Sequence, residues 1–282
     1  MKTVNSFSGG KTSAYLDYHF PSDVTIFSLV RIKGNQYKPL DSGLRREVEK
    51  RIPEFEGTAE SDLTLQTVLD YEQFSGRKIT WVTSHYTFDS LIDKKKFLPN
   101  HYNRYCTYEL KIVPIFEYCY KYLFESKTDK IKMQIGYRID EADRAFEWEI
   151  REKNKIKYPL HSSLSKKENR NTILDWRITG FPLIEEGVTK YMVSDFWKGK
   201  LYFPIVSNCV GCHFHTLNEL RLQAKVESIK LKWWAERERE RERRFKKEFW
   251  YKDLFGEEFL PALDDELFLT GRKSCQSGIC GI

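Results

Sequence analysis

Short apolar runs alternate with segments of helical periodicity over the first two thirds of the chain. The runs are rich in valine, isoleucine and phenylalanine, which is typical of buried strands, whereas the intervening segments repeat apolar residues every three or four positions. This alternation predicts a mainly parallel sheet with helices on both faces. The expected strands are residues 4–7, 24–30, 78–83 and 131–136, and the expected helices are residues 13–19, 44–51, 62–74 and 111–124.

The pattern changes after about residue 205. Cys209 and Cys212 form a Cys-x-x-Cys pair, and a charged segment follows for which we expect one long helix running to about residue 251. A short tail with Cys275 and Cys280 ends the sequence. We therefore expect two parts, an α/β domain at residues 1–205 and a small helical, cysteine-rich lobe at residues 206–282.

Composition narrows the class of protein. The 282 residues are 40% hydrophobic and 15% aromatic, which is enough to bury a substantial core and excludes a disordered tail. No apolar run approaches the roughly 20 residues of a membrane helix, and no signal-peptide core follows Met1. These features predict a cytoplasmic protein without membrane association. Its six cysteines are then expected as thiols or metal ligands rather than disulfides.

The first expected strand runs into a glycine turn that opens a helix. Such a turn gathers unhindered backbone N–H groups and hydroxyl groups around one point, and the helix N-terminus adds partial positive charge, so a phosphate chain is the natural ligand. A Walker loop would require glycine where Asn5 stands, so that motif fails. The pyrophosphate-loop pattern S-G-G-x-x-[ST] fits throughout, at Ser8, Gly9, Gly10, Lys11, Thr12 and Ser13.

Three later segments resemble blocks of the phosphoadenosine phosphosulfate (PAPS) reductase family. Residues 103–115 (NRYCTYELKIVPI) resemble its R-x-C-T-x-x-L-K-x-x-P block, and residues 136–144 (GYRIDEADR) resemble its G-x-R-x-x-E-S-x-R block. Residues 181–184 and 193–197 are similar to its P-L … D-V … W region. The resemblance implies a three-layer α/β/α, Rossmann-like fold of the adenine nucleotide α-hydrolase type, with a mainly parallel five-stranded sheet and residues 1–205 as the nucleotide-binding domain.

The resemblance also implies roles for single residues. Its catalytic candidates are Cys106, Lys111 and Arg138, and cations near the turn would offset the charge of a polyanionic nucleotide. That nucleotide is ATP or a sulfated, PAPS-like adenine nucleotide, with Mg²⁺ expected beside it. The further nucleotide-binding candidates outside the turn are Arg104, Glu141 and Arg144.

Two chemistries remain open under this resemblance. Sulfonucleotide reductases direct a cysteine thiolate at the sulfonyl sulfur. Relatives with an intact Ser-Gly-Gly loop split ATP and adenylate an acceptor, often before sulfur insertion into a nucleic acid. The intact loop favours ATP-dependent sulfur transfer or adenylylation. Thr12 stands where many ATP-splitting members carry aspartate, which keeps a non-catalytic nucleotide-sensing or partner-binding module as a third alternative.

The paired cysteines predict a metal site in the C-terminal lobe. Four thiolates, from Cys209, Cys212, Cys275 and Cys280, suit Zn²⁺ or an iron–sulfur cluster, and their spacing does not separate the two. In cluster-bearing relatives of the reductases, a cysteine pair at the position of Cys106 joins such a Cys-x-x-Cys. A three-cysteine set of Cys106, Cys209 and Cys212 is therefore an alternative.

Three more potential ligands need an assignment. Cys119 is expected in the hydrophobic core. His213 and His215 flank the Cys-x-x-Cys pair and could replace a cysteine as ligands, although roles beside the metal or in solvent are favoured.

The excess positive charge lies in one segment. Residues 221–252 hold twelve Lys and Arg against six Glu, which accounts for the whole net charge of +6. Glu and Arg alternate over residues 236–244, which spreads both signs around a helix and favours local ion pairs in solvent. Basic residues interleaved with aromatics near residues 243–247 keep a nucleic acid, tRNA or DNA, as a predicted partner beside the nucleotide.

Overall fold

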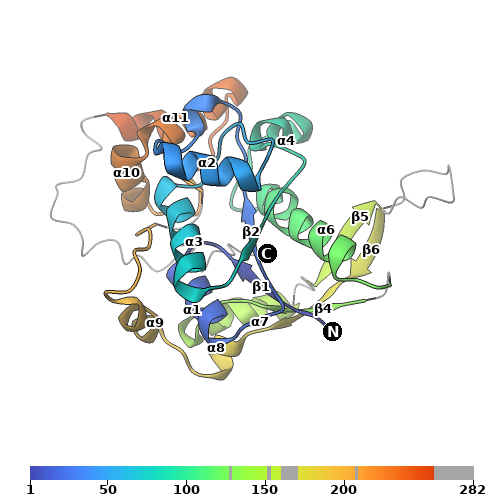
Figure 1. Cartoon of the computed structure of the whole chain (residues 1–282). Helices are drawn as coiled ribbons and strands as arrows, with labels where there is room; N and C mark the ends of the chain where they lie inside the picture. Colours follow the sequence, from blue (N-terminus) through green and yellow to red (C-terminus); the bar gives the residue numbers. More distant parts are fainter. Residues whose placement is uncertain (127–128, 151–153, 160–170, 207–208, 257–282) are drawn as a thin grey trace.

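A five-stranded parallel sheet forms the centre of the computed structural model, which describes residues 1–126, 129–150, 154–159, 171–206 and 209–256. The strand order is β3-β2-β1-β4-β7, so β1 lies in the middle with β2 and β4 on its two sides (Figure 1). The strands are β1 (Thr3–Phe7), β2 (Val24–Leu29), β3 (Ile79–Thr83), β4 (Ile131–Gln134) and β7 (Arg177–Gly180). The predicted α/β class and the four predicted strands are confirmed.

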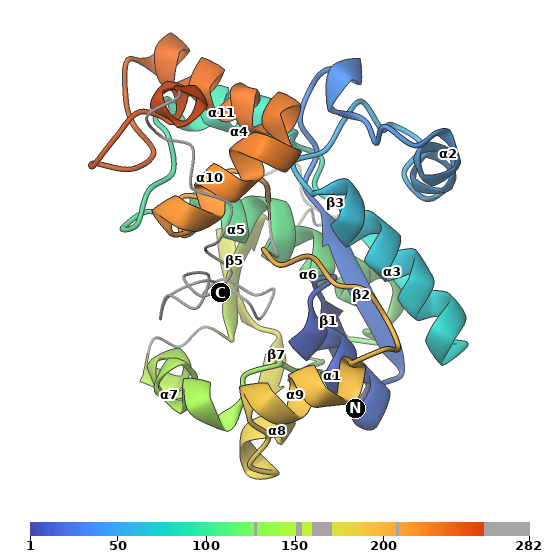
Figure 2. The ribbon, with the colours of Figure 1, turned by 90° about the vertical axis from the view of Figure 1, so that its left-hand side faces the viewer.

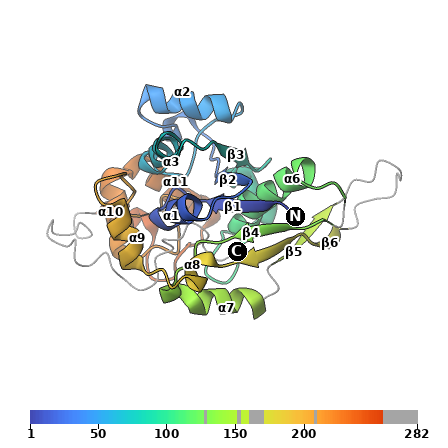
Figure 3. The same cartoon turned by 60° about the horizontal axis from the view of Figure 1, so that its bottom comes forward.

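Helices cover both faces of the sheet, which makes three layers. Along β1, Val4 points to one face and Phe7 to the other, because side chains alternate along a strand. Phe7 joins a buried cluster with α1 (Lys11–His19), α3 (Asp62–Ser75), α8 (Pro182–Glu185) and α9 (Lys190–Trp197). Val4 joins a cluster with α6 (Val113–Tyr122), and α2 (Ser42–Arg51) packs outside α3 (Figure 3).

The segment before α6 is wound more widely than an α-helix. A short α5 (Tyr105–Thr107) leads into a π-helical turn at Tyr108–Ile112, and α6 follows directly. Pro114 has no N–H to donate to the carbonyl four residues earlier, that of Leu110. The Ser28 hydroxyl on β2 donates to this carbonyl instead, at 3.0 Å, which anchors the π turn to the sheet.

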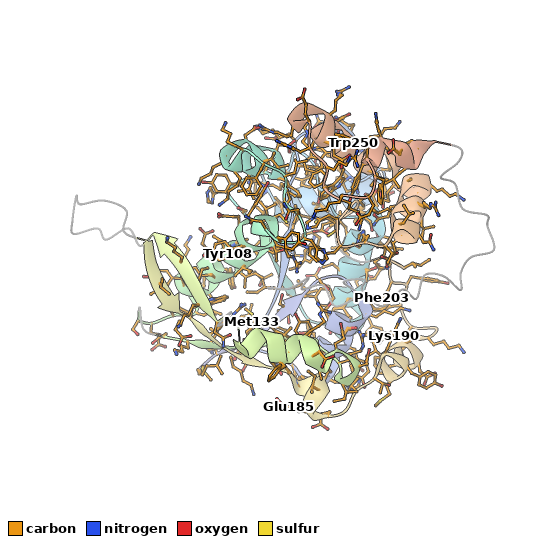
Figure 4. All side chains as sticks on the ribbon, turned by 180° about the vertical axis from the view of Figure 1, so that it is seen from behind. Tyr108, Met133, Glu185, Lys190, Phe203 and Trp250 are labelled. Atoms are coloured by element: carbon orange, nitrogen blue, oxygen red, sulfur yellow. The ribbon has the colours of Figure 1, made fainter. Side chains whose placement is uncertain are left out.

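A second, two-stranded sheet stands apart from the first. It pairs β5 (Lys155–Pro159) with β6 (Asn171–Asp175) in antiparallel register. Tyr108, labelled in Figure 4, ties the π turn to this hairpin, because its hydroxyl group exchanges two hydrogen bonds of 2.9 Å with the backbone of Lys157. The strands expected from the sequence include neither this hairpin nor β7.

The prediction of one long charged helix after the Cys-x-x-Cys pair is wrong. The segment forms two helices, α10 (Leu217–Val226) and α11 (Ser228–Arg241), and the second ends at Glu242 in left-handed conformation. The early end of α11 follows from the buried Glu238, whose carboxylate accepts hydrogen bonds from the backbone N–H groups of Phe245 and Tyr251 at 2.9 and 2.6 Å. These bonds turn the chain back onto α11.

The two C-terminal helices pack against the carboxyl edge of the sheet. Trp233 and Trp234 on α11 contact Phe88 at the start of α4 (Phe88–Lys95), with ring centroids 5.1 and 5.4 Å apart. The Trp233 indole also donates to Asp89 at 2.8 Å (Figure 2 shows α10 and α11 beside α4). One hydrophobic cluster runs from Val30 to the C-terminal helices, so residues on both sides of the predicted boundary near residue 205 contribute to a shared core.

α7 (Ala142–Ile150) follows a 3-10 turn at Ile139–Glu141, and further 3-10 turns lie at Asn35–Tyr37 and, near the end of the described chain, at Tyr251–Phe255. Within the described residues, no helix combines the length and apolar character that a membrane crossing requires.

Gly211 provides a test of the packing between the Cys-x-x-Cys loop and α11. Its φ of +78° is left-handed, and an added Cβ would overlap the indole ring of Trp234. We expect Gly211→Ala to lower the free energy of unfolding by about 2–4 kcal/mol, measured by urea denaturation.

Gly76→Ala is the matched control, because Gly76 has φ +68° but nothing within 4 Å of the added Cβ. Its expected loss is about 1 kcal/mol, the cost of the backbone conformation alone. Equal losses in the two variants would contradict the packing described for Trp234.

Candidate functional site

Two of the predicted site segments lie at the carboxyl edge of the sheet, after β1 and after β4. Ser8 follows β1, Val30 follows β2, and Gly136 lies just beyond β4. The connection that follows β1 leads to β2 on one side, whereas β4 lies on the other side of β1, so the strand order reverses at the turn after β1. Such a switch point is where open α/β sheets bind their ligands, so the glycine turn occupies the expected position for a binding site.

The glycine turn packs closely against α3. Gly9 has φ +76°, and an added Cβ would lie 2.6 Å from the Thr64 methyl group on α3, so only glycine fits. α1 begins at Lys11 with Gly10 as its N-cap, and no side chain among the described residues caps it. The first N–H groups of α1 are therefore left for an outside acceptor such as a phosphate oxygen.

Hydrogen bonds from both sides fix the shape of this turn. The Ser8 N–H group donates to the Ser13 hydroxyl at 3.2 Å, and that hydroxyl donates to the Gly10 carbonyl at 2.9 Å. The Trp197 indole on α9 donates to the Lys11 carbonyl at 3.0 Å. The turn is thus held in one conformation before any ligand binds.

The predicted cations beyond β4 lie beside the turn but already have anionic partners. Arg138 donates to the Thr12 hydroxyl at 2.9 Å and pairs with Asp140 and Glu141 at 2.9 and 3.0 Å. Arg144 also pairs with Glu141. The segment around β4 is therefore brought to the turn as predicted, with the charge of both arginines partly offset by neighbouring carboxylates.

A cavity of about 40 Å³ lies beyond the end of β2, and three thiols line it. Cys106, Cys209 and Cys212 come together there, which is the alternative cysteine set. Cys275 and Cys280 lie outside the described residues. The remaining lining residues are Val30, Phe88, Arg104, Thr107, Leu110, Lys111, His213, Phe214 and Trp234. Cys119 is fully buried on α6, which confirms its predicted place in the core.

Backbone contacts hold the Cys-x-x-Cys loop in place. Cys209 forms an antiparallel bridge with Glu60, and the Val210 N–H group donates to the Ala59 carbonyl at 2.7 Å. Gly211 donates to the Gln223 side chain at 2.8 Å and accepts from the Tyr251 hydroxyl at 2.7 Å. The loop is therefore fixed between the sheet and the C-terminal helices.

A buried ion pair forms one wall of the cavity region. The Lys111 ammonium group lies 3.4 Å from the Glu60 carboxylate, and the Cys209 thiol donates to the same carboxylate at 3.7 Å. Burial alone would lower the pKa of Lys111, but Glu60 and then Cys209 raise it above the ordinary value. Lys111 therefore stays charged and keeps a cation beside the thiols.

The three thiols are held in their neutral form. Burial, followed by the neighbouring Cys212, raises the pKa of Cys106 to about 11, although Arg104 opposes this. Burial likewise raises the pKa of Cys209 and Cys212. A bound metal cation would reverse this preference, because cysteine binds metals as the thiolate.

His213 is the most unusual group in the cavity. Its side chain is 4% exposed, and neither ring nitrogen has a hydrogen-bond partner among the described residues. Burial, aided by Arg104 and Lys246, lowers the pKa of His213 to about 3, so the imidazole is neutral at pH 7. Next to it, the Arg104 guanidinium lies 3.9 Å from the centre of the Phe214 ring.

The donor atoms in this cavity fit a group that prefers sulfur and nitrogen ligands. Thiols and a neutral imidazole are the ligands of Zn²⁺ and of iron–sulfur clusters. In the described part of the chain, no three His, Cys, Asp or Glu side chains already converge closely enough to hold a metal ion. Binding would therefore require the thiols and the imidazole to rotate toward one another.

The basic residues of α11 serve mainly to attach the helix. Arg237 pairs with Asp89 on α4 at 3.1 Å, and Arg241 pairs with Asp93 on the same helix. Lys230 pairs with Asp62 at the start of α3. The predicted pairing within the helix also occurs, since Arg237 pairs with Glu240 at 2.6 Å, but the pairs that attach α11 join separate elements.

Two residues that shape the site have no sequence motif. Glu60 supports the cysteine loop and Lys111, and Thr64 closes the space next to Gly9.

Comparisons of this chain with protein-family models, curated proteins and solved structures find no match. A functional assignment therefore depends on the geometry of the site and on the motif resemblance.

The raised pKa of Cys106 predicts slow alkylation at neutral pH. A shift from 9.0 to about 11 leaves about 100-fold less thiolate at pH 7 than in an ordinary cysteine. We expect the rate of iodoacetamide labelling at Cys106, followed by mass spectrometry on chelator-treated protein, to keep rising above pH 10.

A short cysteine peptide in the same tube is the reference, and its rate should level off near pH 10, about one unit above the ordinary pKa of 9.0. Circular dichroism at each pH would confirm that the protein remains folded. A labelling rate for Cys106 that levels off with the peptide would contradict the raised pKa.

Proposed function

We propose that the chain is a PAPS-reductase-like enzyme of the pyrophosphate-loop type, with an adenine nucleotide α-hydrolase-like fold. It binds ATP or a sulfated adenine nucleotide and carries out nucleotide-dependent sulfur transfer or adenylylation. One observation carries the proposal: the glycine turn after β1 and the thiol-lined cavity after β2 lie at the same edge of the sheet, on neighbouring strands.

In this proposal the phosphate chain lies on residues 8–13. The uncapped N-terminus of α1 and the hydroxyl groups of the turn supply donors, and Mg²⁺ accompanies the nucleotide. Arg138 contacts the turn by a hydrogen bond to the Thr12 hydroxyl. Arg144 is linked to Arg138 because both arginines pair with Glu141. An acceptor atom attacks the α-phosphorus, the bond between the α- and β-phosphates breaks, and pyrophosphate leaves.

The cavity supplies the sulfur-handling part of the proposed site. Cys106, Cys209 and Cys212 would hold Zn²⁺ or an iron–sulfur cluster, and Lys111 would offset the negative charge of their thiolates. A bound cluster would supply redox or sulfur-carrying chemistry, whereas zinc would stabilise the fold. The acceptor is proposed to be a nucleic acid, because residues 221–252 carry the positive excess.

The second candidate is a sulfonucleotide reductase. It is favoured by the position of Cys106, which shares the cavity with the cationic Arg104. In that reaction the thiolate would attack the sulfonyl sulfur of a sulfated nucleotide. The pKa of about 11 works against it, because little thiolate forms at neutral pH without a further cation nearby.

A third candidate, a nucleotide sensor without turnover, also has one observation in its favour. Asp140 and Glu141 already pair with the arginines that would otherwise face the nucleotide. Arginines paired in this way would still hold the turn, but less of their charge would be left to stabilise a transition state.

Nucleotide binding is tested at Ser8. We expect Ser8→Ala to weaken MgATP binding about 10–100-fold in calorimetric titrations, because a hydrogen bond to a charged group contributes about 1.5–3 kcal/mol. Gly10→Val should weaken it at least as much, by filling the space for the phosphates. Ser22→Ala, at the amino end of β2, is the control and should bind like the parent.

The same proteins distinguish the three candidates. Pyrophosphate release from ATP supports the proposed enzyme, sulfite release from PAPS with a dithiol supports the reductase, and binding without either product supports the sensor. Unchanged ATP binding by Ser8→Ala and Gly10→Val would rule out the pyrophosphate-loop assignment.

Metal content is tested by anaerobic purification with an absorption spectrum and iron, zinc and sulfide analysis of one sample. We expect bound zinc, or iron with sulfide, in the parent and a large loss in Cys209→Ser. Cys119→Ser is the matched control, because Cys119 is equally buried but lies on α6 outside the cavity. Parent protein without metal, or full metal content in Cys209→Ser, would argue against the site.

A further inference from the structure

We infer that His213 is the fourth ligand of the metal or cluster in the thiol cavity, completing a Cys₃His set with Cys106, Cys209 and Cys212. This inference rests on the proposed metal site and assigns one more residue to it. The ligand class is a cation or cluster that accepts both thiolate and imidazole, such as Zn²⁺ or an iron–sulfur centre.

The first argument is the unmet hydrogen-bonding capacity of the His213 ring. Buried polar side chains in folded proteins nearly always have a hydrogen-bond partner, because an unpaired buried group is costly. Both nitrogens of His213 lack one among the described residues, and the ring lines the same cavity as the three thiols. A metal ion in that cavity would give one nitrogen the partner it lacks.

The second argument is the contrast with His215, two residues away. His215 is just as deeply buried, at 1% exposed, but its Nδ1 lies 3.2 Å from the Gln223 side-chain oxygen. The Lys246 ammonium group donates to the backbone carbonyls of both histidines, at 3.0 and 2.9 Å. The backbone of the loop is thus fixed at both positions, and the His213 ring is the one directed to the cavity.

The third argument is charge. Three thiolates and one neutral imidazole carry one negative charge fewer than four thiolates, and the cavity already contains Arg104 and Lys111 as cations. A Cys₃His set also needs no residue from the segment outside the described chain. Cys275 and Cys280 are then not required as ligands of this centre.

Cobalt provides a direct test, because tetrahedral Co²⁺ with thiolate ligands has strong visible bands and occupies zinc-type sites. Metal-free, anaerobic full-length protein would be titrated with Co²⁺ alone. We expect tetrahedral spectra for the parent and a loss of affinity of at least about 100-fold in His213→Leu, because removing a direct ligand should cost more than the 10–100-fold effects of residues that only support ligands. His101→Ala, an exposed histidine stacked on Phe214, should match the parent.

Unfolding measurements separate a ligand from a packing residue. Without metal, His213→Leu should be at least as stable to urea as the parent, because it removes an unpaired buried polar group. With Co²⁺, the parent should gain stability and His213→Leu should gain much less. His213→Cys should restore tetrahedral binding with more intense thiolate-to-cobalt absorption, which keeps the test decisive even if the leucine variant misfolds.

The outcomes distinguish this inference from the proposal beneath it. If the parent binds Co²⁺ tetrahedrally and both His213 variants reproduce its affinity and spectrum, His213 is not a ligand and the three-cysteine site remains. If the parent itself gives no tetrahedral Co²⁺ spectrum, the metal site fails, and the assignment of His213 fails with it.

Discussion

The buried carboxylate of Glu60 is the interaction on which the cavity depends. It is 1% exposed and contacts the ammonium group of Lys111 and the thiol of Cys209, while its backbone carbonyl accepts from Lys230 at 2.7 Å. A carboxylate so deeply buried is tolerated only when it is paired and hydrogen-bonded. Satisfying this carboxylate requires the π turn and the cysteine loop to meet at the end of β2, and the bond from Lys230 to the backbone carbonyl brings α11 to the same residue.

The sequence predicted the elements whose signals are local. Apolar runs identify β1 to β4, and the Ser-Gly-Gly turn is visible because glycine is needed where the chain approaches Thr64. β7 is four residues long and lacks an apolar run, so nothing local marked it. β5 does alternate polar and apolar residues, but its partner strand β6 does not repeat the pattern, and the hairpin was missed. The end of α11 was missed for a different reason. The Glu-Arg repeat favours continued helix, and the hydrogen bonds of Glu238 to distant backbone groups override it.

The candidate site was predictable where topology is simple. Parallel strands share one carboxyl edge, so residues after β1, β2 and β4 were bound to lie near one another. The partners of those residues were not predictable, because burial and contact arise only in the folded chain. Arg138 is next to the turn as expected, yet Asp140 holds it, and the unpaired ring of His213 has no signature in sequence.

The absence of a backbone N–H at Pro114 affects the direction in which side chains point in the helical turn before it. In a regular α-helix, positions five residues apart such as 106 and 111 would point about 140° away from each other. The wider π turn between them brings position 111 back toward the direction of position 106, and both side chains line the same cavity. The Cys106 thiol and the Lys111 ammonium group therefore line one cavity. They do so because a proline in the first turn of α6 leaves the carbonyl four residues earlier to accept from the Ser28 hydroxyl.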